Sequence, residues 1–441
     1  MVKNGAIDLL NEIQRHKREA INNGLIRAEK PYPPIKNNEI PFQLRDGWIW
    51  CRLGEYSLKI TDYVASGSFA SLKDNVLITN EPDYAIMVKT ADFSNGFSKG
   101  LTYTNKRGYD YLTNSNLFGG ELILSNIGSI GKVFIVPKLE RPMTLASNTI
   151  MVKLTDSELT YYLYYFFLSA LGQKTLLDIS SGTSMLKFNK TQLKQVLVPI
   201  APLSKQKTIV ATLDIVSSLI TSYHQELDLL DDLIKSRFVE MFGDVIRNNK
   251  GWNQYAFSDI ATSRLGKMLD AKQQTGKYKY PYLANINVQW FRFELDNLNE
   301  MDFNEADQNE FELKEGDLLV CEGGEIGRCA VWHNEVQPCY FQKALHRVRC
   351  NTDIVLPEYL ARWFQYNCEH GGFASIEGAK ATIAHLPGAK LKVLKVTVPP
   401  VKLQEQFVDY VIQVDKSKVA VQKALDEAQV LFDSLMQQYF G

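Results

Sequence analysis

The sequence predicts an α+β fold in which two tandem α+β modules are separated by a long antiparallel coiled coil of two helices. Apolar residues recur at coiled-coil spacing in two stretches, the two halves of the chain repeat one another, and each half mixes β-rich runs with helical signals. The repeat implies a pseudo-twofold relation between the halves. Because both long helices lie in one chain, the coiled coil does not require a second copy.

Six segments follow from these patterns. We expect an N-terminal helix within residues 1–24, a proline-rich connector at 25–45, a first module at 46–201, a long helix at 202–244, a second module at 245–399 and a second long helix at 400–441. The first helix is amphipathic, and Asn23-Gly24 can end it. The prolines of the connector favour an extended strap.

The two long helices carry a seam of apolar residues at steps of three and four, which predicts a coiled coil. The expected seam residues are Ile209, Leu213, Val216, Ile220, Tyr223, Leu227, Leu230 and Ile234, continuing past Arg237 to Met241, and Phe407, Val411, Val414, Lys418, Val421, Leu425, Phe432 and Leu435. Lys418 distinguishes an antiparallel from a parallel pairing of the two helices. In an antiparallel pair it could reach Asp228, Asp231 or Asp232, whereas in a parallel pair it would face Ile220.

The modules repeat at a shift of 196 residues, for example from Gly128 to Gly324, and the long helices repeat at 198. Both modules contain a glycine-broken β-rich stretch, GGELILSNIGSIGKVFIV and EGDLLVCEGGEIGRCAVW, which predicts strands joined by tight turns. A helix should follow Asp156 in the first module and begin at Pro357 in the second.

Composition points to a globular protein of the cytoplasm. The chain is 45% apolar and 22% charged, its longest apolar run is about half of the ~20 residues that a membrane span needs, and its N-terminus lacks a signal-peptide pattern. The six cysteines form no C-x-x-C pair, so reduced structural thiols are expected and no metal site. A net charge of -1 means that any nucleic-acid surface must be local.

No catalytic residues are predicted. GSIGK at 128–132 lacks the spacing of a phosphate-binding loop, and no glycine-rich cofactor loop follows a strand. Val398-Pro399-Pro400-Val401 lacks the flanking residues with which an amino-methyltransferase grips a flipped adenine. Glu312-Leu313-Lys314 lacks the preceding Pro-Asp of a nuclease motif. The histidines show no pairing with a Ser or Cys nucleophile.

Candidate DNA contacts occur in matching places of the two modules, where cations are interleaved with tyrosines or amides. The candidates of the first module are Lys89, Tyr103, Lys106, Arg107, Tyr109, Lys132, Thr183 and Ser184; those of the second are Lys272, Gln273, Lys277, Lys279, Asn285, Asn287, Arg328 and Lys380. A solvated surface explains any single one of them better than DNA binding does, and only their concentration in both modules favours DNA. The acidic run 294–317 should face away from the duplex or toward a protein.

The chain resembles the specificity subunit of type I restriction-modification systems. The resemblance covers nearly the whole chain and includes the duplicated module, the entry Pro202-Leu203 with Gln206, the ending EMFGD at 240–244, LLNEIQRHKREAINNG and GWIWCRLGE. It implies two target-recognition domains that read the halves of a bipartite, asymmetric DNA site, two methylation subunits docked around the coil, and further restriction subunits. A helix from Ile209 to Met241 would span about 48 Å, comparable with about 14 base pairs.

The resemblance also implies that this chain is non-catalytic and binds no cofactor, with S-adenosylmethionine in the methylation subunit and ATP and Mg in the restriction subunit. The second long helix departs from the family pattern, since it lacks the EMFGD ending. We expect the chain termini to meet, with Ile7, Leu10 and Ile21 packed near the far end of the coil. Two alternatives stay open: a self-contained adenine methyltransferase or nuclease, and a coiled-coil adaptor without DNA function.

Overall fold

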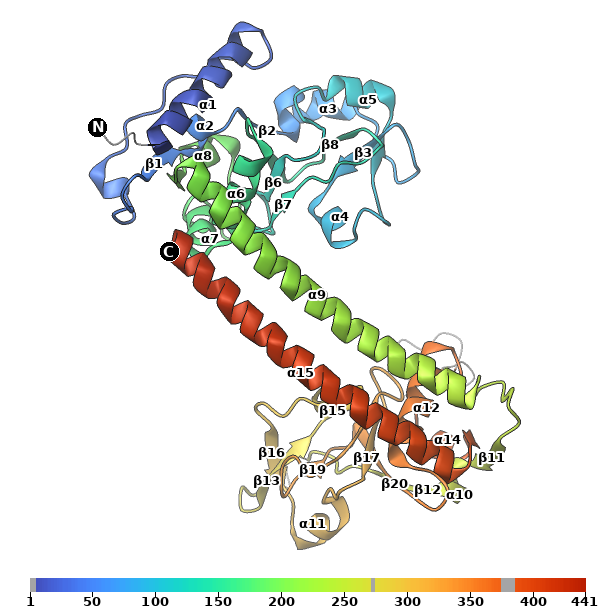
Figure 1. Cartoon of the computed structure of the whole chain (residues 1–441). Helices are drawn as coiled ribbons and strands as arrows, with labels where there is room; N and C mark the ends of the chain where they lie inside the picture. Colours follow the sequence, from blue (N-terminus) through green and yellow to red (C-terminus); the bar gives the residue numbers. More distant parts are fainter. Residues whose placement is uncertain (1–4, 271–273, 374–384) are drawn as a thin grey trace. The chain divides into compact units, whose positions relative to one another are not determined.

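The structure, a computed structural model, describes residues 5–270, 274–373 and 385–441. The chain divides into two compact units, Met1–Ser222 with Ala424–Gly441, and Tyr223–Lys423. The long helices α9 (Leu203–Phe242) and α15 (Val401–Phe440) each contribute one half to each unit. Each unit therefore contains one module and two half-helices (Figure 1).

The module of the first unit follows an N-terminal helix and a connector. Its elements, in chain order, are α1 (Gly5–Asn22), η1 (Asn37–Glu39), β1 (Ile49–Arg52), α2 (Leu53–Tyr56), β2 (Lys59–Asp62), η2 (Tyr63–Ser66), α3 (Phe69–Asn75), β3 (Ala85–Val88), α4 (Thr90–Ser94), β4 (Tyr103–Thr104), α5 (Lys106–Tyr111), β5 (Asn116–Leu117), β6 (Leu122–Ser125), β7 (Val133–Ile135), β8 (Met143–Leu145), β9 (Thr149–Lys153), α6 (Ser157–Leu168), α7 (Ala170–Asp178), α8 (Lys190–Gln195) and β10 (Leu197–Ile200). The strands form sheets in the orders β2-β9-β6-β7, β4-β3-β8-β5 and β1-β10.

The module of the second unit has the same plan. Its elements are β11 (Asn253–Ala256), α10 (Phe257–Ile260), β12 (Ala261–Leu265), β13 (Lys279–Leu283), η4 (Asn285–Asn287), β14 (Val288–Gln289), β15 (Arg292–Phe293), β16 (Asn299–Asp302), α11 (Glu305–Phe311), β17 (Leu318–Cys321), β18 (Cys329–Val331), β19 (Tyr340–Phe341), β20 (Leu345–Cys350), α12 (Pro357–Glu369), α14 (Gly388–Lys392) and β21 (Lys395–Val398). Its sheets are β12-β20-β17-β18, β16-β13-β19, β11-β21 and β14-β15.

The predicted internal repeat is confirmed at the level of single backbone hydrogen bonds. The matching bonds join Ser125 N to Lys132 O (3.0 Å) and Cys321 N to Arg328 O (2.8 Å), Asn126 N to Asn148 O (3.2 Å) and Glu322 N to Ala344 O (3.0 Å), and Val136 N to Glu121 O (2.9 Å) and Trp332 N to Asp317 O (2.8 Å). The predicted helix starts are also present, with Asp156 capping α6 and proline in the first turn of α12.

The inner strands β6 of the sheet β2-β9-β6-β7 and β17 of the sheet β12-β20-β17-β18 are buried on both faces. In β6, Leu122 and Leu124 belong to a core that includes the long helices, whereas Ile123 belongs to the core of the neighbouring sheet. Leu318 and Leu319 of β17 divide in the same way. Alternate side chains of a strand point to opposite faces, so a strand between two cores must be apolar throughout.

A buried glutamine amide joins each module to its long helix. Gln206 Nε2 donates to Ala201 O (2.8 Å), and the Tyr56 hydroxyl donates to Gln206 Oε1 (2.8 Å). Gln404 Nε2 donates to Pro399 O (2.8 Å), and Gln404 Oε1 accepts the backbone N–H that precedes α12 (2.9 Å). The amides thus satisfy carbonyls at the turn where each strand passes into its helix.

The long helices pack antiparallel within each unit. In the first unit, Ile209 near the start of α9 shares a core with Phe440 at the end of α15. In the second unit, Phe238 near the end of α9 contacts Phe407 near the start of α15, with ring centroids 5.5 Å apart. Lys418 Nζ donates to Asp231 Oδ1 at 2.6 Å, the contact predicted for an antiparallel pair.

Every predicted seam residue is buried or half-buried, but the seam widens where it meets the modules. Phe238 and Phe242 are buried at 3% and 1% exposure, although the spacing had favoured Met241. Both rings also contact Tyr359 of α12, at 5.7 and 4.9 Å between centroids. The helix packs against its module as well as its partner helix, so its buried stripe is broader than an a/d seam.

The N-terminal helix ends as predicted, at Gly24 with φ of 70°. Its buried face differs from the expected one. Ala6, Leu9 and Ile13 are buried, whereas Ile7 is 45% exposed, because a helical stripe at steps of three and four places position 7 on the opposite side. The expectation for Ile7 is therefore wrong.

The connector is fixed to the module by Arg52, which is 4% exposed. Its Nε donates to Pro33 O (3.1 Å), Nη1 to Gln195 O (2.9 Å) and Nη2 to Glu39 Oε1 (2.9 Å). Arg45 of the connector donates to Gln438 O in the last turn of α15. The connector is therefore held by specific polar contacts as well as by its prolines.

The six cysteines are free thiols, and four of them are buried. Burial raises the pKa of Cys339 and of Cys350 to about 12. Across the described ranges, no helix combines the length and apolarity needed to span a bilayer, and no three His, Cys, Asp or Glu side chains are grouped so that they could hold a metal ion.

We predict that Phe407→Ala lowers the free energy of unfolding by about 3–5 kcal/mol, because it leaves a cavity among aromatic rings. Val419→Ala on the same helix removes a side chain that is 71% exposed and should change stability by less than about 0.5 kcal/mol. Urea denaturation monitored by circular dichroism measures both. Equal effects of the two substitutions would contradict the packing of α15 in the second unit.

The stability of the folded protein is expected to depend on pH through His346. This residue is 1% exposed, and its Nε2 lies 2.9 Å from Leu386 O. Burial lowers the pKa of His346, with the hydrogen bond to Leu386 O partly offsetting it. Because the unfolded chain binds the proton more readily, this contribution to stability is present above about pH 6.5 and falls below it. His346→Gln should lose less stability than the wild type between pH 7.5 and 5.5, whereas exposed His224→Gln should match the wild type.

Candidate nucleic-acid interface

Three loops of the first module meet at one edge of the sheet β2-β9-β6-β7, where its strands end. The end of β6 pairs with the start of β9, so the glycine turn 126–132 and the loop 146–148 lie at this edge. The loop 180–187 joins them, because Ile127 pairs with Lys187 and Gly128 N donates to Leu186 O (3.1 Å). This edge, formed by the three loops, is called the loop edge below.

Three predicted DNA contacts meet at the loop edge of the first module. Lys132 is exposed and its ammonium has no polar partner in the described parts of the chain, and Thr183 and Ser184 are exposed on the neighbouring loop. Gly182, in the loop 180–187, has φ of 127°, a conformation that suits glycine. A cation beside two hydroxyls and exposed backbone can contact phosphates.

The second module forms an equivalent loop edge. Its glycine turn 322–328 is joined to residues 385–386, because Gly323 pairs with His385 and Leu386 N donates to Glu322 O (2.7 Å). Lys380 lies outside the described residues. Arg328 occupies the place of Lys132, but its Nη2 donates to Asn285 O (3.0 Å) and its side chain is only 17% exposed. Arg328 therefore supports the turn that starts η4.

Two other candidates of the first module lie by the second sheet and are engaged internally. Lys89 Nζ donates to Thr102 Oγ1 (2.6 Å). The Tyr103 ring lies under the Arg141 guanidinium at 5.2 Å from its centroid. Neither side chain forms a hydrogen bond or ion pair with the loop edge in the described part of the chain.

The candidates on α5 form a small cluster of their own. Lys106 Nζ lies 2.8 Å from Asp110 Oδ2 and 5.5 Å from the ring centroid of Tyr84, and Tyr109 packs edge-on against the same ring at 5.4 Å. Lys106 is exposed, so its pair with Asp110 contributes little to stability. This cation could exchange its carboxylate for a phosphate.

A cavity of about 740 Å³ opens between α3 and the start of α5. Arg107 lines it and donates Nη2 to Asn75 Oδ1 (3.2 Å), and the apolar residues Phe69, Leu77 and Ile78 beside it are exposed. The guanidinium of Arg107 could bind a phosphate, and the apolar side chains beside it could contact a thymine methyl group. The sequence gives no sign that Leu77 and Ile78 are exposed, because the run VLIT at 76–79 is typical of a buried strand.

The amide candidates of the second module are largely structural. Asn287 is 8% exposed; its Oδ1 accepts Ala284 N (2.9 Å), and its Nδ2 donates to Glu294 O (3.0 Å). Asn285 is half-buried, with its carbonyl bound by Arg328. The buried Asn287 amide is therefore used to hold the turn.

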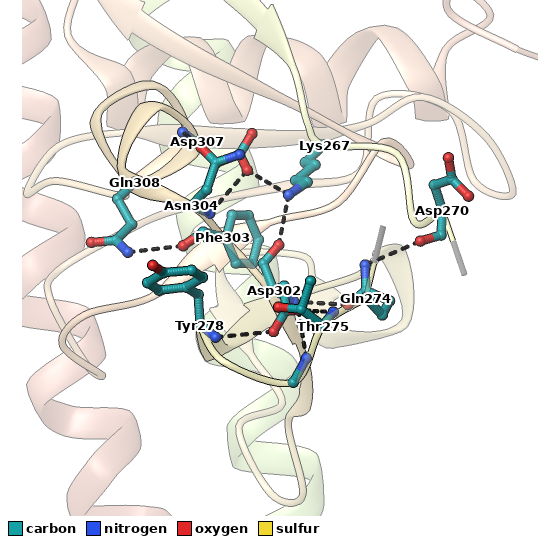
Figure 2. Close-up of polar contacts among 11 residues, drawn as sticks. Lys267, Asp270, Gln274, Thr275, Tyr278, Asp302, Phe303, Asn304, Asp307 and Gln308 are labelled. Atoms are coloured by element: carbon teal, nitrogen blue, oxygen red, sulfur yellow. Dashed lines mark hydrogen bonds and ion pairs between the residues drawn. The ribbon is translucent and has the colours of Figure 1, made fainter. Parts of the chain in front are cut away.

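The lysine candidates of the second module lie on the segment that leads into β13. Lys277 and Lys279 are exposed, and neither ammonium has a partner in the described part of the chain. Lys272 and Gln273 lie outside the described residues. Residues 274–278, called the anchored loop below, are held by the carboxylate of Asp302 at the end of β16 (Figure 2).

Asp302 was absent from the sequence-based candidates because it belongs to an acidic run. Its Oδ2 accepts Thr275 Oγ1 (2.8 Å), Thr275 N and Gly276 N (2.7 Å), and its Oδ1 accepts Tyr278 N (3.1 Å). Burial alone would raise the pKa of Asp302, but these hydrogen bonds outweigh it and hold the pKa below its usual value. The carboxylate is thus ionised when it binds the loop.

Four other carboxylates of the acidic run are paired with cations of the same module. The ion pairs are Arg264–Glu310, Lys267–Asp307 (2.6 Å), Arg292–Glu294 and Arg349–Asp317 (2.6 Å). Local pairing reduces the negative potential that the sequence composition implies for this segment. The run therefore need not repel DNA as strongly as its composition suggests.

Comparisons with known proteins agree with this architecture. A family model described as "Type I restriction modification DNA specificity domain" matches residues 59–231 and again 249–428. The EcoAI specificity subunit of Escherichia coli is 26% identical over 226 residues, which cover 47% of this chain and 35% of the relative. The EcoKI specificity subunit of Escherichia coli K12 is 21% identical over 293 residues, or 63% of each chain. The matches span less than two thirds of either relative.

Solved structures show the same fold. The type I restriction-modification S subunit of M. genitalium superposes with a TM-score of 0.50 at 14% identity, covering 91% of this chain and 98% of that one. A chain from a structure titled "Structural basis underlying complex assembly and conformational transition of the type I R-M system" gives 0.55 at 15% identity, with 91% and 99% covered. Since the two family-model matches together cover most of the sequence, the chain belongs to the family of type I restriction-modification DNA specificity domains.

Proposed function

We propose that this chain is the DNA specificity subunit of a type I restriction-modification complex and that its two modules read the two halves of a bipartite, asymmetric DNA site. One observation carries the proposal. The modules share a backbone hydrogen-bond scheme but present different side chains at equivalent places, such as free Lys132 and engaged Arg328. One scaffold with two unlike surfaces suits two unlike half-sites.

The DNA contacts differ between the modules in this proposal. In the first, Lys132, Thr183 and Ser184 at the loop edge and Arg107 at the cavity contact the duplex. In the second, Lys277 on the anchored loop takes the leading role. The equivalent helices α5 and α11 support this difference, because α5 begins with Lys106 and Arg107, whereas α11 is acidic.

Protein partners are expected on the long helices. We infer that two methylation subunits dock there and that restriction subunits join the full complex. Apolar side chains on the outer faces of these helices support a protein contact, and the most exposed are Ile215, Leu229, Val419 and Val430. The chain itself acts without catalysis or cofactor in this proposal, with S-adenosylmethionine bound by the methylation subunits and ATP and Mg by the restriction subunits.

Mapping methylated adenines in DNA from cells that carry the complete system tests the proposal. A split motif with two unlike halves is expected, and it should disappear when this chain is deleted. Methylation without sequence preference, or a motif that survives the deletion, would overturn the proposal. Binding of S-adenosylmethionine by the isolated chain would instead support a self-contained methyltransferase.

We predict that Lys277→Ala, in the full chain assembled with its methylation subunits, weakens DNA binding similarly for all sequences. The loss of one phosphate contact should reduce the slope of log affinity against log salt by about 0.9. Lys314→Ala is the matched control, because Lys314 is exposed in the same module but lies in the acidic run. Equal salt slopes for the two variants would exclude Lys277 from the interface.

A further inference from the structure

We propose that Asp302 is a positioning residue for sequence recognition by the second module. Its carboxylate holds the anchored loop in the conformation that reads one half of the DNA site, although Asp302 itself contacts no DNA. This inference rests on the proposed function. It assigns a specificity role to an acidic residue within a run that composition alone would place away from the duplex.

The geometry shows a carboxylate surrounded by donors. Three backbone N–H groups and one hydroxyl from Thr275, Gly276 and Tyr278 converge on its two oxygens (Figure 2). A carboxylate has room for about four such bonds. Gly276 has φ of 75°, which turns consecutive N–H groups toward one anion. The loop conformation is therefore specified by Asp302.

Asp302 is itself held in place from the other side. Its backbone pairs with Lys279 in the ladder between β16 and β13. Lys267 Nζ donates to Asp302 O (2.6 Å) and to Asp307 Oδ2 (2.6 Å), and the Gln274 side chain accepts Asp302 N (2.8 Å). A side chain on a strand fixed by these contacts can transmit a precise position to the loop.

The Lys277 and Tyr278 side chains of the anchored loop are exposed, while backbone N–H groups of the same loop bind Asp302. Asp302 is 4% exposed, whereas Tyr278 is 49% exposed and Lys277 is exposed beside it. Met268 and Leu269, earlier in the same segment, are exposed as well. A loop that presents a cation and an aromatic ring has the chemistry of a nucleic-acid contact. Backbone anchoring leaves these groups available to DNA.

The first module has no aspartate two residues before the cap of its corresponding helix. Asn105 caps α5 and Asn304 caps α11, but two residues before the cap the first module has Tyr103 where the second has Asp302. There Tyr103 binds the preceding loop through its backbone, from Tyr103 N to Thr79 O (2.7 Å) and from Thr79 N to Tyr103 O (3.0 Å). Loss of Asp302 should therefore affect only the half-site that the second module reads.

The experiment uses the complete system in cells, with methylated adenines mapped for each variant. Asp302→Ala should make one half of the motif degenerate, with discrimination at its base pairs reduced about tenfold or more, while the other half stays intact. Asp302→Asn keeps one acceptor oxygen and should lie between Ala and wild type. Glu300→Gln is the matched control, because it removes the same charge from an exposed position of β16 and should leave both halves unchanged.

Thr275→Val keeps the test decisive if Asp302→Ala does not assemble. It removes one hydrogen bond from an exposed residue and should relax the same half of the motif to a smaller degree. Unchanged specificity in Thr275→Val and Asp302→Asn, or equal loss in both half-sites, would overturn the positioning role. Absence of a split motif in the wild type would instead overturn the proposed function.

Discussion

The architecture depends on the buried glutamine amides at the two junctions between module and long helix. Gln206 and Gln404 are 1% and 0% exposed, and each binds the carbonyl of the residue before its helix-starting turn. Burial of an amide is favourable only when its groups are paired, so the direction in which the helix leaves the module is fixed. Both the packing of the half-helices and the cores beneath them follow from that direction.

Much of the fold could be predicted from the sequence, because repetition and heptad spacing are properties of the chain itself. The repeat, the long helices and the contact between Lys418 and Asp231 all follow from spacing. Phe238 could not be assigned from spacing, since it is buried against the module as well as against α15. Ile7 was misplaced for a related reason: apolar residues occur on more than one side of the N-terminal helix, and the sequence alone does not say which side is buried.

The candidate interface was less predictable, because residue type does not reveal whether a polar group is already engaged. Asn287 has an attractive side chain for reading adenine, but a turn uses both of its polar atoms. Asp302 shows the reverse case, since a carboxylate in an acidic run organises the loop that carries Lys277. Only the three-dimensional partners separate the two cases.

The boundaries of the two units fall in the middle of α9 and α15, at Ser222–Tyr223 and Lys423–Ala424. Each half-helix packs its strongly buried residues against the module of its own unit, as Leu213 does in the first and Phe407 in the second. A genetic exchange with both crossovers near these points would transfer a module together with the helix halves that complete its core. Such cassettes would let one reading surface diverge while the other is inherited unchanged.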